Sequence, residues 1–302
     1  MDIIRIDHLT KYYGNSRGIT DLSLAVRKGE FFGFIGPNGA GKSTTIRILL
    51  GLIRATSGKA SVFNMDVSFK NKKILENVGY IPSEAMFYHN TTVDEILRLS
   101  AGLRRKNCSE EARLLCDRLQ LDARQKTDSL SLGSRKKVSI VCALQHNPDL
   151  CIFDEPTSGL DPLIQKEFFE ILKERNKQGC TIFLSSHILS EVQKYCTRAA
   201  VIREGRLAAC GDIAQLAGAK AKRITLAADD LAPICQFLTC LQRHPTDTID
   251  SCIRDLQIAN ETVSFLFQGN IKSLVDRLSE VSYTDITIIE PELSEIFMHY
   301  YE

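Results

Sequence analysis

Short apolar runs alternate with amphipathic stretches from the N-terminus to about residue 216. Apolar runs at 3–6, 22–26, 31–35, 150–153 and 181–185 predict strands, because buried strands are short and continuously hydrophobic. Apolar residues spaced every three to four positions predict helices at 42–50, 93–103 and 110–119. Strands alternating with helices predict a largely parallel sheet covered by helices.

Two of the predicted helices carry clear end signals. Thr92 and Glu95 form a capping-box pattern in front of the helix at 93–103. Another helix lies between the last two predicted strands, with Asp161 as its cap, Pro162 at its first position and Gly179 just past its end. These signals fix where both helices begin.

The pattern restarts after residue 217 and predicts a second, smaller domain. Strands are expected at 224–227, 253–258, 262–267 and 285–289, and helices at 231–241 and 271–281. The order β-α-β-β-α-β is that of ferredoxin-like folds. A last helix is expected at 292–300. We therefore divide the chain into domains at 1–217 and 218–302.

Composition narrows the possible partners and compartments. A net charge of +1 with 25% charged residues gives no broad basic surface, so no nucleic-acid partner is expected. The ten cysteines are scattered without a Cys-x-x-Cys pair, which predicts buried, reduced thiols and a cytoplasmic protein. The first residues lack the pattern of a signal peptide, and no uninterrupted apolar run could span a bilayer. Any membrane role must therefore act through a partner.

A phosphate-binding loop follows the strand predicted at 31–35. Its sequence is GPNGAGKST, in which Gly36 is followed by four residues and then by Gly41, Lys42 and Ser43. Glycines let backbone N–H groups surround an anion, and the start of the next helix adds its dipole. Lys42 would reach the β and γ phosphates, and Ser43 would offer its hydroxyl to Mg²⁺. The alternative, a glycine turn with a surface lysine, is disfavoured by the flanking strand and helix.

Two further strands end in polar residues suited to the same chemistry. Asp154 and Glu155 close the segment LCIFDEP, at the strand end where open α/β sheets bind ligands. Asp154 would hold magnesium through water and Glu155 would polarise the attacking water, although both acids could instead cap the next turn. His187 ends the strand in FLSSHILSEV. A lone histidine is more often structural, but its position at a strand end matches the other two motifs.

The segment SLSLGSRKKVSI, at 129–140, predicts a helix whose first turn carries Arg135, Lys136 and Lys137. Cations are slightly unfavourable beside the positive end of a helix dipole unless an anion faces them. The three side chains therefore either help bind an anion or form a solvated basic face. Ser131 and Gly133, at the start of the helix, are the candidate anion contacts.

These motifs, with LSLGS before Asp154 and SGLD after it, make residues 1–217 resemble the ATP-binding subunit of an ABC transporter. The resemblance implies an α/β fold: a phosphate-loop NTPase cassette with a mixed, mostly parallel sheet and a helical subdomain. It also implies ATP and Mg²⁺ as cofactors. In that family two subunits sandwich two ATP molecules, so Ser131 and Gly133 would contact the γ phosphate bound to the other subunit.

The resemblance also assigns roles by position. Tyr13 matches the aromatic residue that stacks on adenine, with Tyr12 as a neighbouring candidate. Glu155 matches the catalytic base, His187 the switch histidine that senses the γ phosphate, and Asp161 the element that couples the two sites. The residues expected to contact nucleotide or metal are Tyr13, Asn38, Gly39, Gly41, Lys42, Ser43, Thr44, Ser131, Gly133 and Asp154.

Three positions depart from the family pattern. Leu132 and Ser134 stand where the second glycine and the glutamine of the common LSGGQ pattern would be. Ser83 replaces a glutamine that touches magnesium and reports to the membrane subunit. Serine is too short for both tasks, so either Glu84 reaches the metal or water, or the site turns over slowly.

The function implied is that of an ATPase coupled to export through a separate membrane permease. The subunit would lie at the cytoplasmic face of the membrane and pair with an identical or closely related subunit. Met86, Phe87 and Tyr88 would dock the permease or pack under the next helix. The second domain and the ending EPELSEIFMHYYE resemble exporter ATPases of the drug and antimicrobial-peptide resistance type.

A soluble ABC-type ATPase acting on ribosomes, DNA or cofactor assembly is the alternative function. A phosphate-loop kinase or GTPase would leave LSLGS and the His187 segment unexplained.

Overall fold

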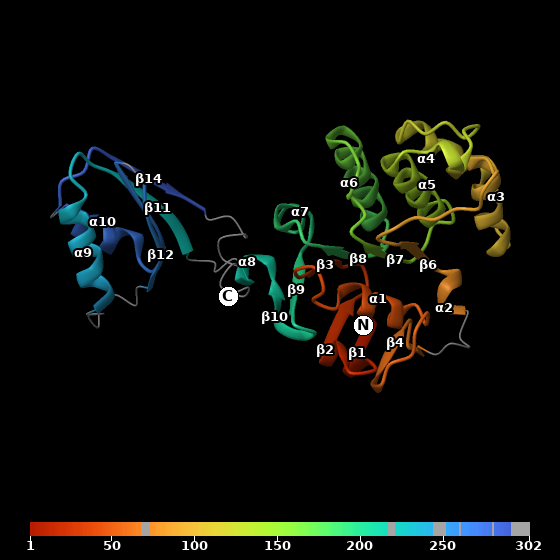
Figure 1. Ribbon diagram of the computed structural model, residues 1–302, viewed down its shortest axis with the longest axis horizontal. Coiled ribbons are helices and arrows are strands. Elements are labelled where there is room, and N and C mark those ends of the chain that lie inside the picture. Colours follow the sequence, from red (N-terminus) through yellow and green to blue (C-terminus); the bar gives the residue numbers. More distant parts are fainter. Residues whose placement is uncertain (68–72, 217–220, 244–251, 260, 280, 291–302) are drawn as a thin grey trace. The chain divides into compact units, whose positions relative to one another are not determined.

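The computed structural model describes residues 1–67, 73–216, 221–243, 252–259, 261–279 and 281–290 (Figure 1). The chain divides into two compact units, Met1–Ile213 and Ala214–Glu302. The helix predicted at 292–300 lies outside the described residues.

Six strands form the central sheet of the first unit, in the order β10-β9-β3-β8-β7-β6. Their bounds are β3 Phe31–Ile35, β6 Val78–Ile81, β7 Leu150–Asp154, β8 Thr181–Ser186, β9 Arg198–Arg203 and β10 Arg206–Asp212. All neighbouring strands are parallel except β9 and β10. Strands β3, β7 and β8 are buried along their whole length, as their apolar sequences predicted. Their carboxyl ends therefore meet at one edge of the sheet.

A second sheet of the same unit is antiparallel, so the unit combines a mostly parallel core with antiparallel strands, which is the mixed arrangement that the resemblance implied. Its order is β2-β1-β4-β5, with β1 at Asp2–Tyr13, β2 at Ser16–Arg27, β4 at Ser57–Val62 and β5 at Met65–Asp66. Buried and exposed positions alternate irregularly along β1 and β2, as in a sheet with one solvated face. The pairing shifts register between Ile6 and Leu9, which interrupts the alternation and hides most of β1 from a sequence pattern.

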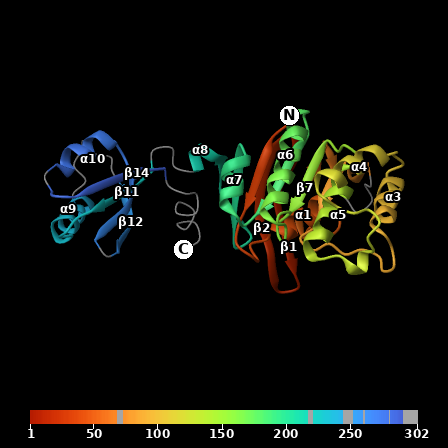
Figure 2. The same ribbon diagram turned by 90° about the horizontal axis from the view of Figure 1, so that it is seen from above.

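The helices of the first unit are α1 Lys42–Leu49, α2 Lys73–Glu76, α3 Val93–Leu103, α4 Ser109–Arg118, α5 Leu132–Leu144, α6 Pro162–Lys177 and α7 Leu189–Tyr195. Helix α8, Ile213–Leu216, begins at the last residue of this unit. A 3₁₀ turn covers Thr127–Ser129. Helices α3, α4 and α5 are grouped together at one end of the unit (Figures 1 and 2). Among the described helices, none is both long enough and apolar enough to cross a bilayer.

Helix α1 is fixed by a core that includes residues of both sheets. Ile46 and Leu49 of α1 are buried in one cluster with Ile4 of β1 and Phe34 of β3. Phe34 in turn packs on Phe183 of β8, with ring centroids 5.2 Å apart. Each fully buried side chain of this size contributes roughly 1.5–3 kcal/mol, so the start of α1 has little freedom to move.

Two predicted helix starts are confirmed by their hydrogen bonds. The Glu95 N–H donates to Oγ1 of Thr92 at 3.3 Å, and the Thr92 N–H donates to Oε2 of Glu95 at 2.7 Å, which completes the capping box of α3. The Ile164 N–H donates to Oδ1 of Asp161 at 3.0 Å, and Pro162 is the first residue of α6. Local side-chain chemistry therefore decides where these helices begin.

The second unit contains an antiparallel sheet in the order β12-β13-β11-β14. Its elements are β11 Ala221–Ala227, α9 Ala232–Arg243, β12 Cys252–Ala259, β13 Thr262–Gln268, α10 Ile271–Leu278 and β14 Asp285–Ile289. Side chains of both helices share a buried cluster with Phe265 and Phe267 of β13. The β-α-β-β-α-β order and this strand arrangement are those expected for a ferredoxin-like unit.

Candidate nucleotide site

The loop between β3 and α1 has a backbone suited to binding an anion. Gly41 stands directly before α1 with a φ of 107°, where a residue with a side chain is strained. A Cβ on Gly41 would also lie 2.6 Å from Cγ2 of Ile19, so this position requires glycine. Within the described part of the chain no side chain caps α1, so the N–H groups of Lys42, Ser43 and Thr44 remain available at its N-terminus.

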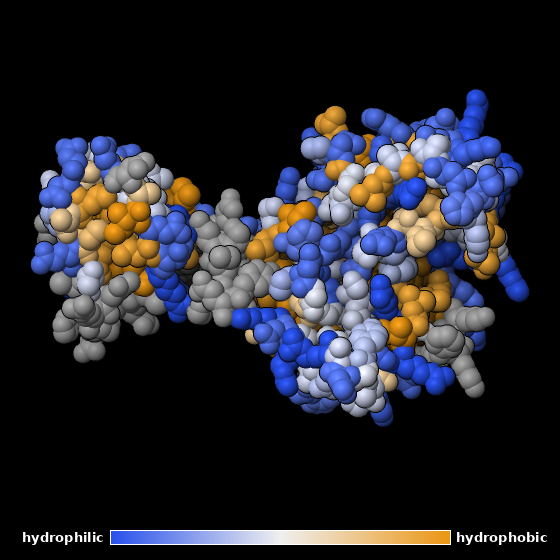
Figure 3. Space-filling model, in the orientation of Figure 1, coloured by the Kyte–Doolittle hydropathy of each residue, from blue (hydrophilic) through white to orange (hydrophobic). Residues whose placement is uncertain are grey.

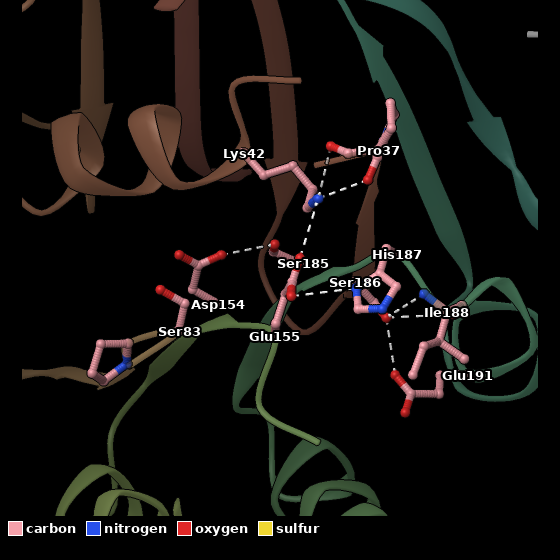
Figure 4. Close-up of polar contacts among 12 residues, drawn as sticks. Pro37, Lys42, Ser83, Asp154, Glu155, Ser185, Ser186, His187, Ile188 and Glu191 are labelled. Carbon is pink, nitrogen blue, oxygen red and sulfur yellow. Dashed lines mark hydrogen bonds and ion pairs between the residues drawn. The ribbon is translucent and has the colours of Figure 1, made fainter. Parts of the chain in front are cut away.

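The Lys42 side chain folds over this loop and is 5% exposed. Its Nζ donates to the carbonyl oxygens of Gly36 at 2.6 Å and Pro37 at 3.1 Å (Figure 4). It also lies 3.3 Å from Oε1 of Glu155. A buried ammonium is costly without an opposite charge nearby, and Glu155 supplies that charge. Asn38 lies exposed in the same loop.

Glu155 follows β7 and contacts two of the other motifs. While Oε1 faces Lys42, Oε2 lies 3.3 Å from Nδ1 of His187. The backbone of Glu155 has a φ of 50°, a left-handed conformation that costs a non-glycine residue of the order of 1–3 kcal/mol. Its N–H donates to the carbonyl oxygen of Ser185 at 3.1 Å. The structure thus brings Lys42, Glu155 and His187 into direct contact.

Asp154 is the last residue of β7 and is 1% exposed. Its Oδ1 accepts a hydrogen bond from Oγ of Ser185 at 3.1 Å (Figure 4). Burial, with a further effect of the Asp154 charge, raises the pKa of Tyr80 to about 12. The Asp154 carboxylate and the Ser43 hydroxyl are oxygen donors of the kind that Mg²⁺ takes. Among the described residues no group of three His, Cys, Asp or Glu could hold a metal, so an ion here would need phosphate or water oxygens as well.

His187 lies between β8 and α7, with 48% of its side chain exposed. The preceding Ser186 anchors this segment: its Oγ accepts from the Ile188 N–H at 2.9 Å and donates to Oε2 of Glu191 at 3.0 Å. Burial raises the pKa of the Glu191 carboxyl. The hydrogen bonds of Ser186 therefore fix the backbone beside His187, and the half-exposed His187 ring contacts Glu155.

Tyr12 and Tyr13 end β1 and are almost equally exposed, at 43% and 45%. They differ in what surrounds them. A Cβ placed on Gly18 would lie 3.1 Å from Cε2 of Tyr13 and 3.2 Å from Cγ2 of Thr44, so the Tyr13 ring lies beside the first turn of α1. The Tyr12 N–H donates to Oγ1 of Thr56 instead. Of the two aromatic residues, only Tyr13 is thus placed beside the phosphate loop by a contact.

The start of α5 is a separate feature. Ser131 is its N-cap, and Oγ of Ser131 accepts from the Ser134 N–H at 3.1 Å. Among the described residues the hydrogen bonds of the Ser131 side chain stay within this first turn. Gly133 packs so tightly that a Cβ would lie 2.6 Å from the carbonyl oxygen of Gly159. Ser131 is exposed, so it lies at the surface of the unit.

Lys136 corrects one of the two alternatives that the sequence left open for the basic turn. It is not part of a solvated basic face, because it is 2% exposed. Its Nζ donates to the carbonyl oxygens of Pro82 at 3.1 Å, Ser83 at 2.9 Å and Glu155 at 3.2 Å. One signal could have revealed this: Lys136, Ile140 and Ala143 lie on one helical stripe, and the other two are core residues.

Ser83 and Glu84 follow β6, and Ser83 is the residue at which the sequence departs from the family pattern. The Ser83 carbonyl is bound by Lys136, and the Glu84 side chain is exposed in the loop. Arg135 is exposed and Lys137 is half-buried. Of the three cations, Lys136 is therefore the one that the fold draws toward the site.

Comparison with known proteins gives consistent matches over the first unit. The sequence model described as "ABC transporter" matches residues 19–158. The bacitracin transport ATP-binding protein BcrA of Bacillus licheniformis is 43% identical over 213 residues, 68% of this chain and 68% of that protein. The linearmycin resistance ATP-binding protein LnrL of Bacillus subtilis is 28% identical over 98% of this chain and 97% of its own length. A solved structure titled as the ATP binding subunit of an ABC transporter superposes with a TM-score of 0.66 at 31% identity, covering 71% of this chain and 91% of that one.

Replacing Gly133 tests the close approach at the start of α5. Gly133→Ala forces a Cβ against the Gly159 carbonyl, so we expect a loss of about 1–3 kcal/mol in the free energy of unfolding. Gly102→Ala, in α3 with nothing within 4 Å of the added Cβ, is the matched control and should stabilise by up to about 1 kcal/mol. Urea unfolding measures both. Equal stability of the two variants would contradict the described packing.

Proposed function

Since the chain belongs to the ATP-binding subunits of ABC transporters, ATPases that power transport, we propose that it hydrolyses ATP between two such subunits and thereby drives export through a separate permease. The observation that carries the proposal is the contact of Glu155 with both Lys42 and His187 at the edge of the central sheet. BcrA is named as a transport ATP-binding protein and the matched structure as a subunit of an ABC transporter, which favours this function over a soluble ABC-type ATPase.

The phosphate loop would bind the nucleotide through its backbone and Lys42. The triphosphate would meet the free N–H groups at the start of α1, and Lys42 would exchange its contact with Glu155 for the β and γ phosphates. Ser43 and Asp154 would hold Mg²⁺, which neutralises phosphate charge when bound. Tyr13, beside Thr44, would stack on the adenine.

Glu155 would act as the general base. Once phosphate oxygens satisfy Lys42, the carboxylate is free to accept a proton from a water molecule that attacks the γ phosphorus, and ADP and inorganic phosphate leave. His187 is in contact with Glu155, so it would hold the carboxylate on that side and report the position of the γ phosphate. The left-handed backbone of Glu155 aims its side chain between these two groups.

The second subunit would complete the site with Ser131 and Gly133. The supporting observation is that Ser131 is exposed at the N-terminus of α5, where a hydroxyl, backbone N–H groups and the helix dipole are directed outward. Such a helix end suits the γ phosphate bound by the other copy. The partner would be a second copy or a close homologue of this chain.

The permease would dock near the loop after β6. Hydrophobic and hydrophilic residues are interspersed on the face shown in Figure 3. Met86 and Tyr88 are among the most exposed large apolar residues described, at 90% and 69%, and they lie three and five residues after Ser83. The names of the relatives, bacitracin transport and linearmycin resistance, support an exporter of the drug and antimicrobial-peptide resistance type, with this subunit at the cytoplasmic face of the membrane.

Replacing the proposed base tests hydrolysis and pairing together. Glu155→Gln keeps the size of the side chain but removes the base, so the ATPase rate should fall at least about a hundredfold. Phosphate release measures the rate. With ATP the same variant should elute from gel filtration as a dimer, because the closed pair cannot reopen without hydrolysis.

The control for this variant is Glu110→Gln, an exposed carboxylate at the start of α4, which should leave the rate within about twofold of wild type. A Glu155→Gln protein that hydrolyses ATP at the wild-type rate would contradict the proposed role of Glu155.

The two neighbouring tyrosines provide a matched pair for the adenine contact. Tyr13→Ala should weaken ATP affinity by about 1–3 kcal/mol, the value of one base stacked on an aromatic ring. Tyr12→Ala removes a similarly exposed ring from a residue whose backbone N–H bonds Thr56, and affinity should stay within about twofold. Binding of a fluorescent ATP analogue measures both. A larger loss for Tyr12→Ala would assign the stacking role to Tyr12.

A further inference from the structure

Lys136 is a buried cation that the proposed reaction does not yet use. Its ammonium group has three N–H donors, and the structure gives it three carbonyl acceptors, from Pro82, Ser83 and Glu155. Burial lowers the pKa of Lys136, and the charges of Asp154 and Glu155 oppose that shift. An uncharged residue would fill this space at a lower desolvation cost, so the interactions with the carbonyls need a reason.

The carbonyl of Glu155 supplies that reason. Glu155 adopts the left-handed backbone conformation that asparagine and glycine tolerate better, and such strain persists only where the surroundings hold it. Here both backbone groups are held: the N–H by the Ser185 carbonyl and the C=O by Lys136. Without the ammonium, one of these two restraints on the direction of the Glu155 side chain is lost.

The same ammonium joins three segments that are far apart in the sequence. Lys136 lies on α5, five residues after Ser131; Pro82 and Ser83 follow β6; Glu155 follows β7. Helix α5 is anchored by buried Val138, Ile140 and Leu144, so it moves as a rigid element. A displacement of Ser131 would therefore be carried by Lys136 to the backbone of Glu155 and to the Ser83 loop.

We propose that Lys136 is a positioning residue for ATP hydrolysis, which fixes the Glu155 backbone and the Ser83 loop relative to α5. The inference rests on the proposed role of Glu155 as the base. Through this contact, the helix end that would face the partner's nucleotide is tied to the base of the chain's own site. Lys136 therefore affects the chemical step and leaves nucleotide binding to the phosphate loop.

The test is the kinetics of three variants of the full chain. Lys136→Met keeps the length of the side chain without a donor, and kcat should fall about tenfold or more while KM for ATP stays within about twofold. Lys136→Gln keeps two N–H donors, so its kcat should lie between that of Lys136→Met and that of the wild type. Lys166→Met, an exposed lysine on α6, is the control and should match wild type.

A purely structural role would alter stability and KM together and would not follow the number of donors. If Lys136→Met does not fold, Lys136→Gln decides, with a kcat reduced at least about threefold at an unchanged KM. Wild-type kcat in the folded variants, or a loss confined to KM, would overturn the inference. Parallel measurement of Glu155→Gln separates the two claims. If Glu155→Gln stays active, the proposed role of Glu155 as the base is wrong. If Glu155→Gln is inactive but the Lys136 variants keep the wild-type kcat, the proposed role of Lys136 is wrong.

Discussion

The candidate site is organised around one buried ammonium group, that of Lys42, which must lie near a negative charge. Lys42 lies over the phosphate loop with two carbonyls and one carboxylate around it, and the carboxylate is that of Glu155. Because a buried charge without a counterion is costly, Lys42 constrains where Glu155 lies. A phosphate group that approaches the loop would compete for the same ammonium. In the proposed reaction, nucleotide binding and release of Glu155 would therefore be one electrostatic exchange.

The remaining scaffold makes this exchange precise. Helix α1 shares one buried core with residues of both sheets, so the direction of the free N–H groups at its N-terminus is fixed. The backbone of Glu155 is held in a strained conformation by hydrogen bonds from two directions, one to Ser185 and one from Lys136. His187 stands on a segment anchored by Ser186. In the proposed reaction, such constraints would keep these groups in place while the Glu155 carboxylate exchanges Lys42 for water.

Local sequence signals predicted much of this arrangement. The glycine loop, the capping box at Thr92 and the Asp161 cap each depend on residues within a few positions, and the structure places the helix starts accordingly. The buried parallel strands were also visible as continuous apolar runs. The apolar pattern did not reveal the full length of β1 or its antiparallel pairing, because the register shift after Ile6 breaks the period of the strand. The burial of Lys136 has a sequence signal in its stripe with Ile140 and Ala143, but its three acceptors have none, because they are carbonyls of distant segments that no side-chain pattern records.

The central claim is that a nucleotide bound by Lys42 of one subunit is contacted by Ser131 of a second. A crystal structure of the Glu155→Gln protein with ATP and Mg²⁺ tests it most directly. The account predicts a pair in which Lys42 contacts the β and γ phosphates and Oγ of the other subunit's Ser131 is hydrogen-bonded to the γ phosphate. A nucleotide bound to Lys42 with Ser131 remote from any triphosphate in every assembly would contradict it.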